Sequence, residues 1–328
     1  MNKFNRFGLG LLFLGVIGTF PTSFAYGYDE INVRNGGTVV GRVTMKGEIP
    51  SPRVFPLVLY PFGPFCKRIS DGKGNVLLEE FYVGAGGGLK DTVVAVEQVK
   101  KGKPFPHINS KWVTEDCMFH PAEASFSEKY VEDEDGKIHH EHPLVTVLEN
   151  HQRISVENLD PVIHNIQVFQ NEKGNIVLNV PLSPGAKDAG GTLNFTRGRR
   201  ISQMICGMHE FMQSWGFVVD NPYYTNTQKN GDFKIGQLPP GTYKIVAWHP
   251  HFEPIEKEIT VAENGAATID FEFDSAEVKR PIYESQEKFR IGPEALPNEH
   301  LTHTAPFRQH PPGKEPKREN PDRGERDN

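Results

Sequence analysis

The sequence has no long apolar run after its first twenty residues, no stripe of basic side chains and no sustained helical periodicity. A transmembrane helix needs about 20 consecutive apolar residues, so we expect no membrane insertion of the mature chain. The net charge of -6 is mild. Because nucleic-acid binding needs clustered Lys and Arg, the sequence excludes a nucleic-acid partner.

What the chain does contain is 32 Gly, 26 Pro and 22 Phe among its 328 residues. Gly and Pro favour turns, and aromatic residues favour strands. The composition therefore predicts an all-β protein made of many short strands. The length is sufficient for two domains with sizeable cores.

The N-terminus has the pattern of a secretory signal peptide, expected at residues 1–25. Lys3 and Arg6 precede the apolar run 7–20, and small residues before and at Ala25 form a cleavage site. The run is short for a membrane span, although an uncleaved anchor is the alternative. No Cys follows that could carry a lipid. We expect export to a bacterial periplasm, with cleavage near Ala25.

One short stretch carries the chemistry. Cys206, His209 and Met212 recur at intervals of three. Thiolate and thioether ligands together with imidazole select copper, and a His2Cys site with a long axial Met is used for electron transfer. The fourth ligand should come from a distant strand, and His164 is the candidate. Taken singly, a Cys is more often a buried core thiol and a Met is usually packing.

The spacing Cys-x2-His-x2-Met resembles the ligand loop of amicyanin-type and plastocyanin-type cupredoxins. Residues 146–158 are similar to the strand pair that precedes the first His ligand, and residues 161–165 resemble the turn that carries it. The resemblance covers residues 91–220 and implies a Greek-key β-sandwich. It also implies one type-1 copper ion bound by four residues, namely His164, Cys206, His209 and Met212.

Two features depart from this resemblance. Glu210 stands where the family has Pro, so a carboxylate lies beside the ligand that is usually exposed. A polar insertion occupies about residues 123–142, and a charged stretch of this kind is usually a solvated loop. The insertion contains three closely spaced histidines, which either lie on the surface by chance or hold a second metal: His139, His140 and His142.

Two neighbours of the ligands are further candidates. Asn165 could brace the ligand loop through its side chain. Phe211 and Trp215 could shield the site or pack in the core, and core packing is the better interpretation for Trp215.

The chain has only three cysteines. An odd count in an exported protein indicates one functional thiol, which the resemblance assigns to Cys206. The remaining two, Cys66 and Cys117, are expected to pair in an oxidising compartment. Two isolated, buried thiols are the alternative.

Residues 221–274 form a second β unit. The turn at 230–232 and the Leu-Pro-Pro-Gly-x-Tyr segment at 238–243 resemble carboxypeptidase regulatory-like domains, a smaller transthyretin-like β-sandwich without catalytic residues. Residues 36–46 alternate as a strand and resemble the first strand of that family. They either complete this unit or form a matching module. The unit also contains His249 and His251, which we expect in a solvated loop rather than in a metal site.

The expected segments are therefore a signal peptide at 1–25, an N-terminal β segment at 36–90, the cupredoxin domain at 91–220, the second unit at 221–274 and a disordered tail at 275–328. The tail is rich in Pro and charge, and buries too little surface to fold.

These features predict a one-electron transfer protein rather than an enzyme, since no additional His flanks Cys206 to build a second copper centre. The implied partner is a redox protein, either a cytochrome or a copper or haem oxidoreductase. The alternative is a non-catalytic copper-binding or assembly module of a larger redox complex.

Overall fold

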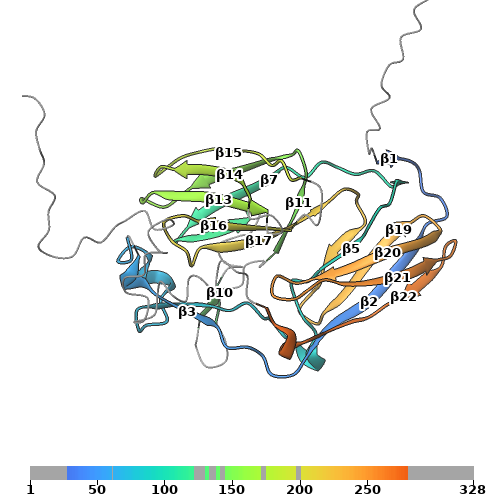
Figure 1. Ribbon diagram of the computed structural model, residues 1–328, viewed down its shortest axis with the longest axis horizontal. Coiled ribbons are helices and arrows are strands. Elements are labelled where there is room, and N and C mark those ends of the chain that lie inside the picture. Colours follow the sequence, from blue (N-terminus) through green and yellow to red (C-terminus); the bar gives the residue numbers. More distant parts are fainter. Residues whose placement is uncertain are drawn as a thin grey trace, which may run out of the picture.

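The computed structural model describes residues 28–60, 62–121, 130–132, 138–140, 145–170, 175–196 and 201–279. Within these ranges the regular structure consists of strands and short 3-10 turns (Figure 1), which confirms the all-β expectation. The expected signal peptide and the tail beyond residue 279 lie outside the described residues. In the part of the chain that is described, no helix is sufficiently long and apolar to span a bilayer.

The first sandwich packs a five-stranded sheet against a four-stranded sheet. In spatial order the larger sheet contains β11 (Val145–Glu149), β17 (Gln213–Val219), β16 (Ile201–Cys206), β13 (His164–Gln170) and β14 (Asn175–Leu182). The smaller contains β15 (Ala189–Thr192), β12 (Arg153–Asn158), β7 (Ser110–Glu115) and β8 (Met118–Pro121). β11 and β17 are parallel, as are β12 and β7. Because parallel neighbours cannot be joined by a hairpin turn, the chain must cross between the two sheets to form these pairs.

Side chains of β13 alternate between buried and partly buried, which explains how one strand contributes residues to both the core and the site. Its burial alternates strictly, so His164, Ile166 and Val168 point into the interior while their neighbours face outward. Ile166 and Val168 are fully buried in the core between the two sheets. The first His of the predicted site therefore lies at the end of a row of core residues.

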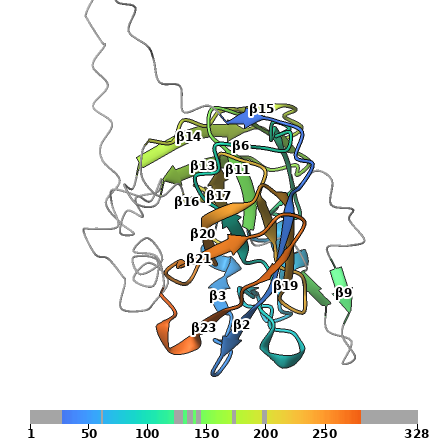
Figure 2. The ribbon, with the colours of Figure 1, turned by 90° about the vertical axis from the view of Figure 1, so that its right-hand side faces the viewer.

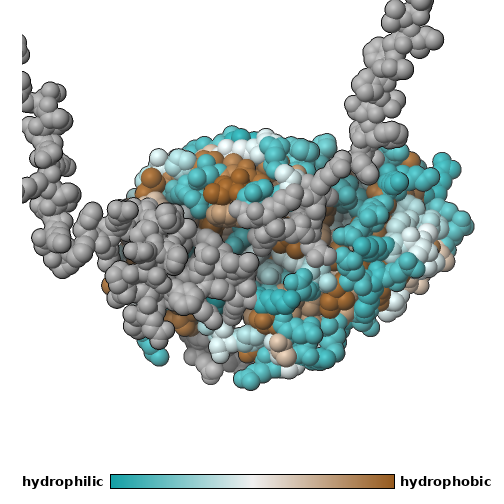
Figure 3. All heavy atoms as spheres, viewed as in Figure 1, coloured by the Kyte–Doolittle hydropathy of each residue, from teal (hydrophilic) through white to brown (hydrophobic). Residues whose placement is uncertain are grey.

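The second sandwich is assembled from distant segments. One sheet contains β18 (Tyr224–Asn226), β5 (Val93–Val96), β20 (Gly241–Trp248) and β21 (Ile255–Val261). The other contains β19 (Asp232–Leu238), β2 (Gly37–Lys46), β22 (Ala266–Thr268) and β23 (Phe271–Asp274). In Figure 3 the described face of this sandwich is mainly hydrophilic, as alternating strands with one buried face require.

The strand expected at residues 36–46 thus completes the C-terminal unit. β2 pairs with β19 and with β22 and β23, and β5 pairs with β18 and β20. The sheets therefore do not follow the linear division at residues 90 and 220. The pairs join residues far apart in sequence, and alternation identifies a strand's faces but not its partner.

The two sandwiches share a third apolar cluster. β16 and β17 are buried on both faces, because one face lies in the first core and the other packs against β5 and β20. The fully or nearly fully buried members include Val93, Ala95, Trp215, Phe217, Val246 and Trp248. Trp215 is a core residue here, at 1% exposure, as expected.

Between β2 and β5 the chain leaves the second sandwich and covers one end of the first (Figure 1). This segment, residues 53–60 and 62–78, is called the cap below. It contains β3 (Arg53–Pro56), η1 (Leu57–Leu59), η2 (Cys66–Ile69) and β4 (Asn75–Leu78), and β3 pairs with β4. β3 ends at Pro56, where the chain turns into η1.

The remaining elements are small, and Figure 2 gives a second view of the molecule. β1 (Asp29–Glu30) pairs with β6 (Lys101–Gly102), β9 (Tyr130–Glu132) pairs with β10 (Ile138–His140), and η3 (Ala85–Gly87) and η6 (Ser275–Glu277) are single turns. β9 and β10 lie in the polar insertion. His142 and the side chains of His139 and His140 lie outside the described residues, so the second-metal alternative stays a prediction.

Candidate metal centre

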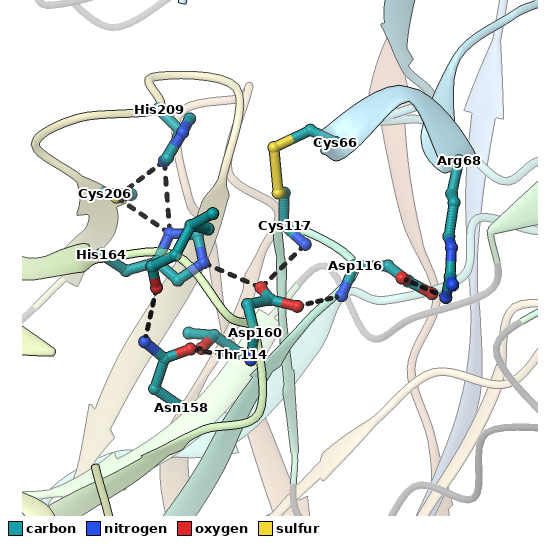
Figure 4. The surroundings of a disulfide bond; sticks show 11 residues. Cys66, Arg68, Thr114, Asp116, Cys117, Asn158, Asp160, His164, Cys206 and His209 are labelled. Atoms are coloured by element: carbon teal, nitrogen blue, oxygen red, sulfur yellow. Dashed lines mark hydrogen bonds and ion pairs between the residues drawn. A yellow bond between two sulfur atoms is a disulfide. The ribbon is translucent and has the colours of Figure 1, made fainter. Parts of the chain in front are cut away.

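Strand register brings the four predicted ligands to one end of the first sandwich. His164 begins β13 and Cys206 ends β16, and these neighbouring strands pair Ile166 with Cys206. His209 and Met212 lie on the loop that leads from Cys206 to β17. All four residues have 0% exposure. Three of them, His164, Cys206 and His209, form a buried group whose ligand atoms lie close enough together to hold an ion (Figure 4).

The donor atoms form a nearly regular triangle. Nδ1 of His164 lies 3.2 Å from Nδ1 of His209, and Cys206 Sγ lies 3.8 and 3.6 Å from these two atoms. A triangle with these sides has a circumscribed circle of radius about 2.1 Å, so one point inside it is that far from all three donors. Bonds from a first-row metal such as zinc are about 2.0–2.1 Å to nitrogen and about 2.3 Å to sulfur. The residues therefore fit a transition metal.

Backbone hydrogen bonds hold the loop in this shape. The amide of Cys206 donates to the carbonyl of Met212 (3.0 Å), that of Met212 donates to His209 (2.9 Å), and that of His209 donates to Cys206 (3.2 Å). The interval of three residues between ligands thus corresponds to tight, hydrogen-bonded turns. Met212 is fully buried in the same apolar cluster as Cys206 and Phe211.

A carboxylate that sequence reasoning missed orients the first imidazole. Oδ2 of Asp160 lies 2.8 Å from Nε2 of His164. A carboxylate that accepts the Nε2 proton leaves the lone pair of Nδ1 directed at the other donors, an arrangement usual for metal-binding His. The available signal was an Asp four residues before the predicted ligand.

Asp160 is itself held by the turn that contains the disulfide. Asp116 and Cys117 both have positive φ (50° and 58°), as a two-residue hairpin turn between β7 and β8 requires. Their amides donate to Asp160 at 2.7 and 3.0 Å. The predicted disulfide between Cys66 and Cys117 is present and ties the cap to this turn (Figure 4). Cys117 also lies near Asp160 and His164, but its sulfur is bonded to Cys66 and is no free ligand.

The electrostatics favour a thiolate next to a charged imidazole. Burial by itself raises the pKa of Cys206, but hydrogen bonds from His164 and His209 outweigh it and lower the pKa to about 6. Burial by itself lowers the pKa of His164, but the hydrogen bonds to Asp160 and Cys206 raise it to about 9. The thiolate is the form that binds a metal.

The hydrogen bonds by which Asn165 holds the ligand loop come from its backbone, whereas the expected brace was its side chain. Its amide donates to Cys206 Sγ at 3.4 Å, and its carbonyl accepts the amide of Gly207 at 2.9 Å. The side chain instead donates to Asn179. Its Oδ1 atom lies against Gly207, where it leaves no room for a Cβ atom on the loop.

The cap covers the ligand that the resemblance implied to be an exposed edge. His209 has 0% exposure, and its ring lies 6.1 Å from that of Phe62 and 5.7 Å from that of Phe211, measured between centroids. Tyr60 packs edge-on against Phe211 at 5.1 Å. Phe211 lies beside His209 and also belongs to the first core cluster, so it combines the two alternatives stated. Phe62 is the neighbour of His209 on the cap and is itself 42% exposed.

His249 and His251 are buried, at 1% and 0% exposure, so the expected solvated loop was wrong. They lie where the second sandwich meets the first, with the His251 ring 5.7 Å from that of Trp215. The sequence carries no signal for this burial because it results from packing between the sandwiches. Among the described residues, neither imidazole belongs to a group of side chains able to hold an ion.

Comparison with known families supports the second unit. A model of the carboxypeptidase regulatory-like domain matches residues 218–274. This range agrees closely with the unit that the turn and strand pattern predicted. A search of curated proteins finds no match.

Among solved structures, the chain is similar to a purple cupredoxin from Nitrosopumilus maritimus, with 16% identity over 34% of this chain and 100% of that one, at a TM-score of 0.22. It is also similar to two variants of amicyanin in the Cu(I) form. Their identities are 12% and 13%, over 38% of this chain and 98% of each, at a TM-score of 0.22.

Proposed function

We propose that this chain is a periplasmic type-1 copper protein that transfers one electron at a time. The observation that carries the proposal is the triangle of two imidazole nitrogens and one thiolate sulfur around a point at bonding distance. Met212, fully buried on the same loop, supplies the weak fourth ligand. A His2Cys set with a weak axial thioether is the donor set of blue-copper sites.

Bound copper supplies a one-electron couple between Cu(II) and Cu(I). The chain does the rest. Asp160 holds the proton on Nε2 of His164, and the amide of Asn165 donates to the Cys206 sulfur. Burial of the ligands excludes water. Because backbone hydrogen bonds close the loop, the donors need not move when the charge at their centre changes.

The burial also bears on the alternative of a copper-handling or assembly module. A protein that passes its ion to another must open a path to it. Here the ligands lie beneath a cap that a disulfide joins to the first sandwich. This arrangement favours an ion that stays in place and exchanges only electrons.

The disulfide supports the proposed location as well, because such bonds persist in oxidising compartments such as the periplasm. We propose a redox protein as the partner, a cytochrome or a copper or haem oxidoreductase.

The test is copper loading followed by visible and electron paramagnetic spectra. The copper-loaded protein should be strongly coloured, and Cys206→Ser should abolish the colour, because the thiolate provides the charge-transfer band. Met208→Leu, on the same loop but outside the ligand set, should keep the colour. A wild type that binds one Cu(II) without a thiolate band would refute the proposal.

A further inference from the structure

A buried chain of polar contacts runs from the second sandwich to the ligand loop and has no part in holding the metal. It consists of Arg53 in the cap, Glu80, His251 after β20, and Gln213 at the start of β17; these four residues are called the clamp below. Their side chains are nearly inaccessible, at 12% for Arg53, 4% for Glu80 and 0% for His251. Gln213 is 6% exposed.

One end of the clamp grips the ligand loop. Gln213 directly follows the proposed ligand Met212, and its Nε2 atom donates to the carbonyl of Glu210 at 2.7 Å. Glu210 directly follows the ligand His209. A single amide side chain therefore spans the second half of the loop. The Oε1 atom of Gln213 accepts from Arg53 at 2.9 Å and from Gln203 at 3.4 Å, so the shorter of the two bonds ties the amide to the guanidinium.

The other end of the clamp reaches the second sandwich. Arg53 donates from Nε to Oε1 of Glu80 at 2.9 Å, and a second guanidinium nitrogen also contacts that oxygen. His251 Nε2 lies 3.1 Å from the same oxygen. Burial by itself raises the pKa of Glu80, but His251 and Arg53 outweigh it and hold the pKa well below its ordinary value. Glu80 is therefore a carboxylate, and Arg53 is fixed between it and Gln213.

Burying these charged and polar side chains costs more free energy of folding than burying apolar residues of the same volume would. Removing charges from water is expensive, and buried ion pairs are often no more stable than well-packed apolar residues of similar volume. What such a network supplies is a single, directional geometry, because a planar guanidinium can satisfy Glu80 and Gln213 together only in one orientation. Through Gln213, this fixed geometry constrains the loop that carries His209 and Met212.

We propose that Arg53 and Gln213 are positioning residues through which the cap and the second sandwich hold the ligand loop in its metal-binding conformation. The second sandwich is then part of the electron-transfer device rather than a passive module. Where it concerns copper, this inference rests on the proposed function. Its effect on the loop does not, because the contacts exist without an ion.

The first test is amide hydrogen exchange of the metal-free protein. Gln213→Met keeps the approximate volume and leaves the Arg53–Glu80 pair intact, but removes the three hydrogen bonds that join the amide to Glu210, Arg53 and Gln203. We expect the amides of His209 and Met212 to exchange about tenfold faster, while that of Val168 in β13 is unchanged. Equal acceleration at all three amides, or none at the loop, would overturn the inference.

The second test uses the copper-loaded protein and Arg53. Arg53→Met should shift the reduction potential and alter the electron paramagnetic spectrum, and Arg53→Lys should restore only part of the change, because lysine cannot serve both partners with a planar fork. Arg42→Met is the matched control, since Arg42 is an exposed arginine of the second sandwich. A spectrum and potential that respond no more to Arg53→Met than to Arg42→Met would contradict the proposal.

The two tests also separate the two hypotheses. If the protein binds no copper, the proposed function fails, yet the exchange measurement still decides whether the clamp holds the loop. If copper binds with a type-1 spectrum and Gln213→Met changes neither exchange nor spectrum, only the clamp is refuted.

Discussion

Asp160 and His164 are joined by a 2.8 Å contact between Oδ2 and Nε2, and both side chains are nearly completely buried. The same carboxylate accepts the amides of Asp116 and Cys117. The orientation of the proposed first ligand is therefore fixed by the hairpin turn that also carries the disulfide (Figure 4). A change at that turn should reach the metal through Asp160.

Asp160→Asn should weaken metal binding about 10- to 100-fold, the usual effect of removing a carboxylate that orients a ligating His. The amide preserves the shape but removes the negative charge opposite Nε2. Affinity is measured by competition with a chelator. Asp188→Asn is the control, because Asp188 is highly exposed and its carboxylate lies far from the site, paired with Arg153 within the described part of the chain. Unchanged affinity would count against the role of Asp160.

Met212→Leu should retain copper and raise the reduction potential, because the proposed axial bond is weak and contributes little of the affinity. A Met to Leu exchange in a core usually costs less than about 1.5 kcal/mol, so the fold should persist. Met208→Leu provides the matched change on the same loop. Voltammetry of the two variants gives the answer, and complete loss of metal from Met212→Leu would rule out an axial role.

Metal affinity should depend on pH in a defined direction. Between about pH 6 and 9 the metal-free site holds a Cys206 thiolate and a protonated His164, since their pKa values are about 6 and about 9. An ion at Nδ1 displaces the proton of His164. This pair therefore releases one proton, and the apparent binding constant should rise about tenfold per pH unit in that window.

Above pH 9 the contribution of this pair should level off, and below pH 6 it should steepen because the thiol must also lose a proton. Calorimetry in two buffers of different ionisation enthalpy counts the protons directly. Release of no proton at pH 7.5 would be inconsistent with the proposed charge state of the pair.

Removing the disulfide should destabilise the protein and loosen the cap. The bond closes a loop of 51 residues, which the chain-entropy model converts to about 4 kcal/mol of stability. Denaturant unfolding of the Cys66→Ser, Cys117→Ser double variant should show this loss. The copper-loaded variant should also release its ion to a chelator faster than the wild type. As a check on the bond, thiol labelling of the denatured, unreduced wild type should detect one cysteine rather than three.

The sequence by itself determined the local parts of the site. The loop that carries Cys206, His209 and Met212 could be predicted because ligands three residues apart fit turns closed by their own backbone hydrogen bonds. His164 could be assigned because residues 161–165 resemble the turn that carries the first His ligand of the family. The pairing of Cys66 with Cys117 followed from an odd count of thiols in an exported chain.

Only the tertiary structure decided what surrounds those ligands. The burial of His209 depends on the cap, and that of His251 depends on how two sandwiches meet. Asp160 acquires its role from a turn 43 and 44 residues earlier in the chain. The alternation of residues along a strand predicts which of its faces is apolar. It does not predict which distant part of the chain packs on that face. Contacts of this kind arise from the packing of remote segments, so they could not be predicted from the spacing of residues in the sequence.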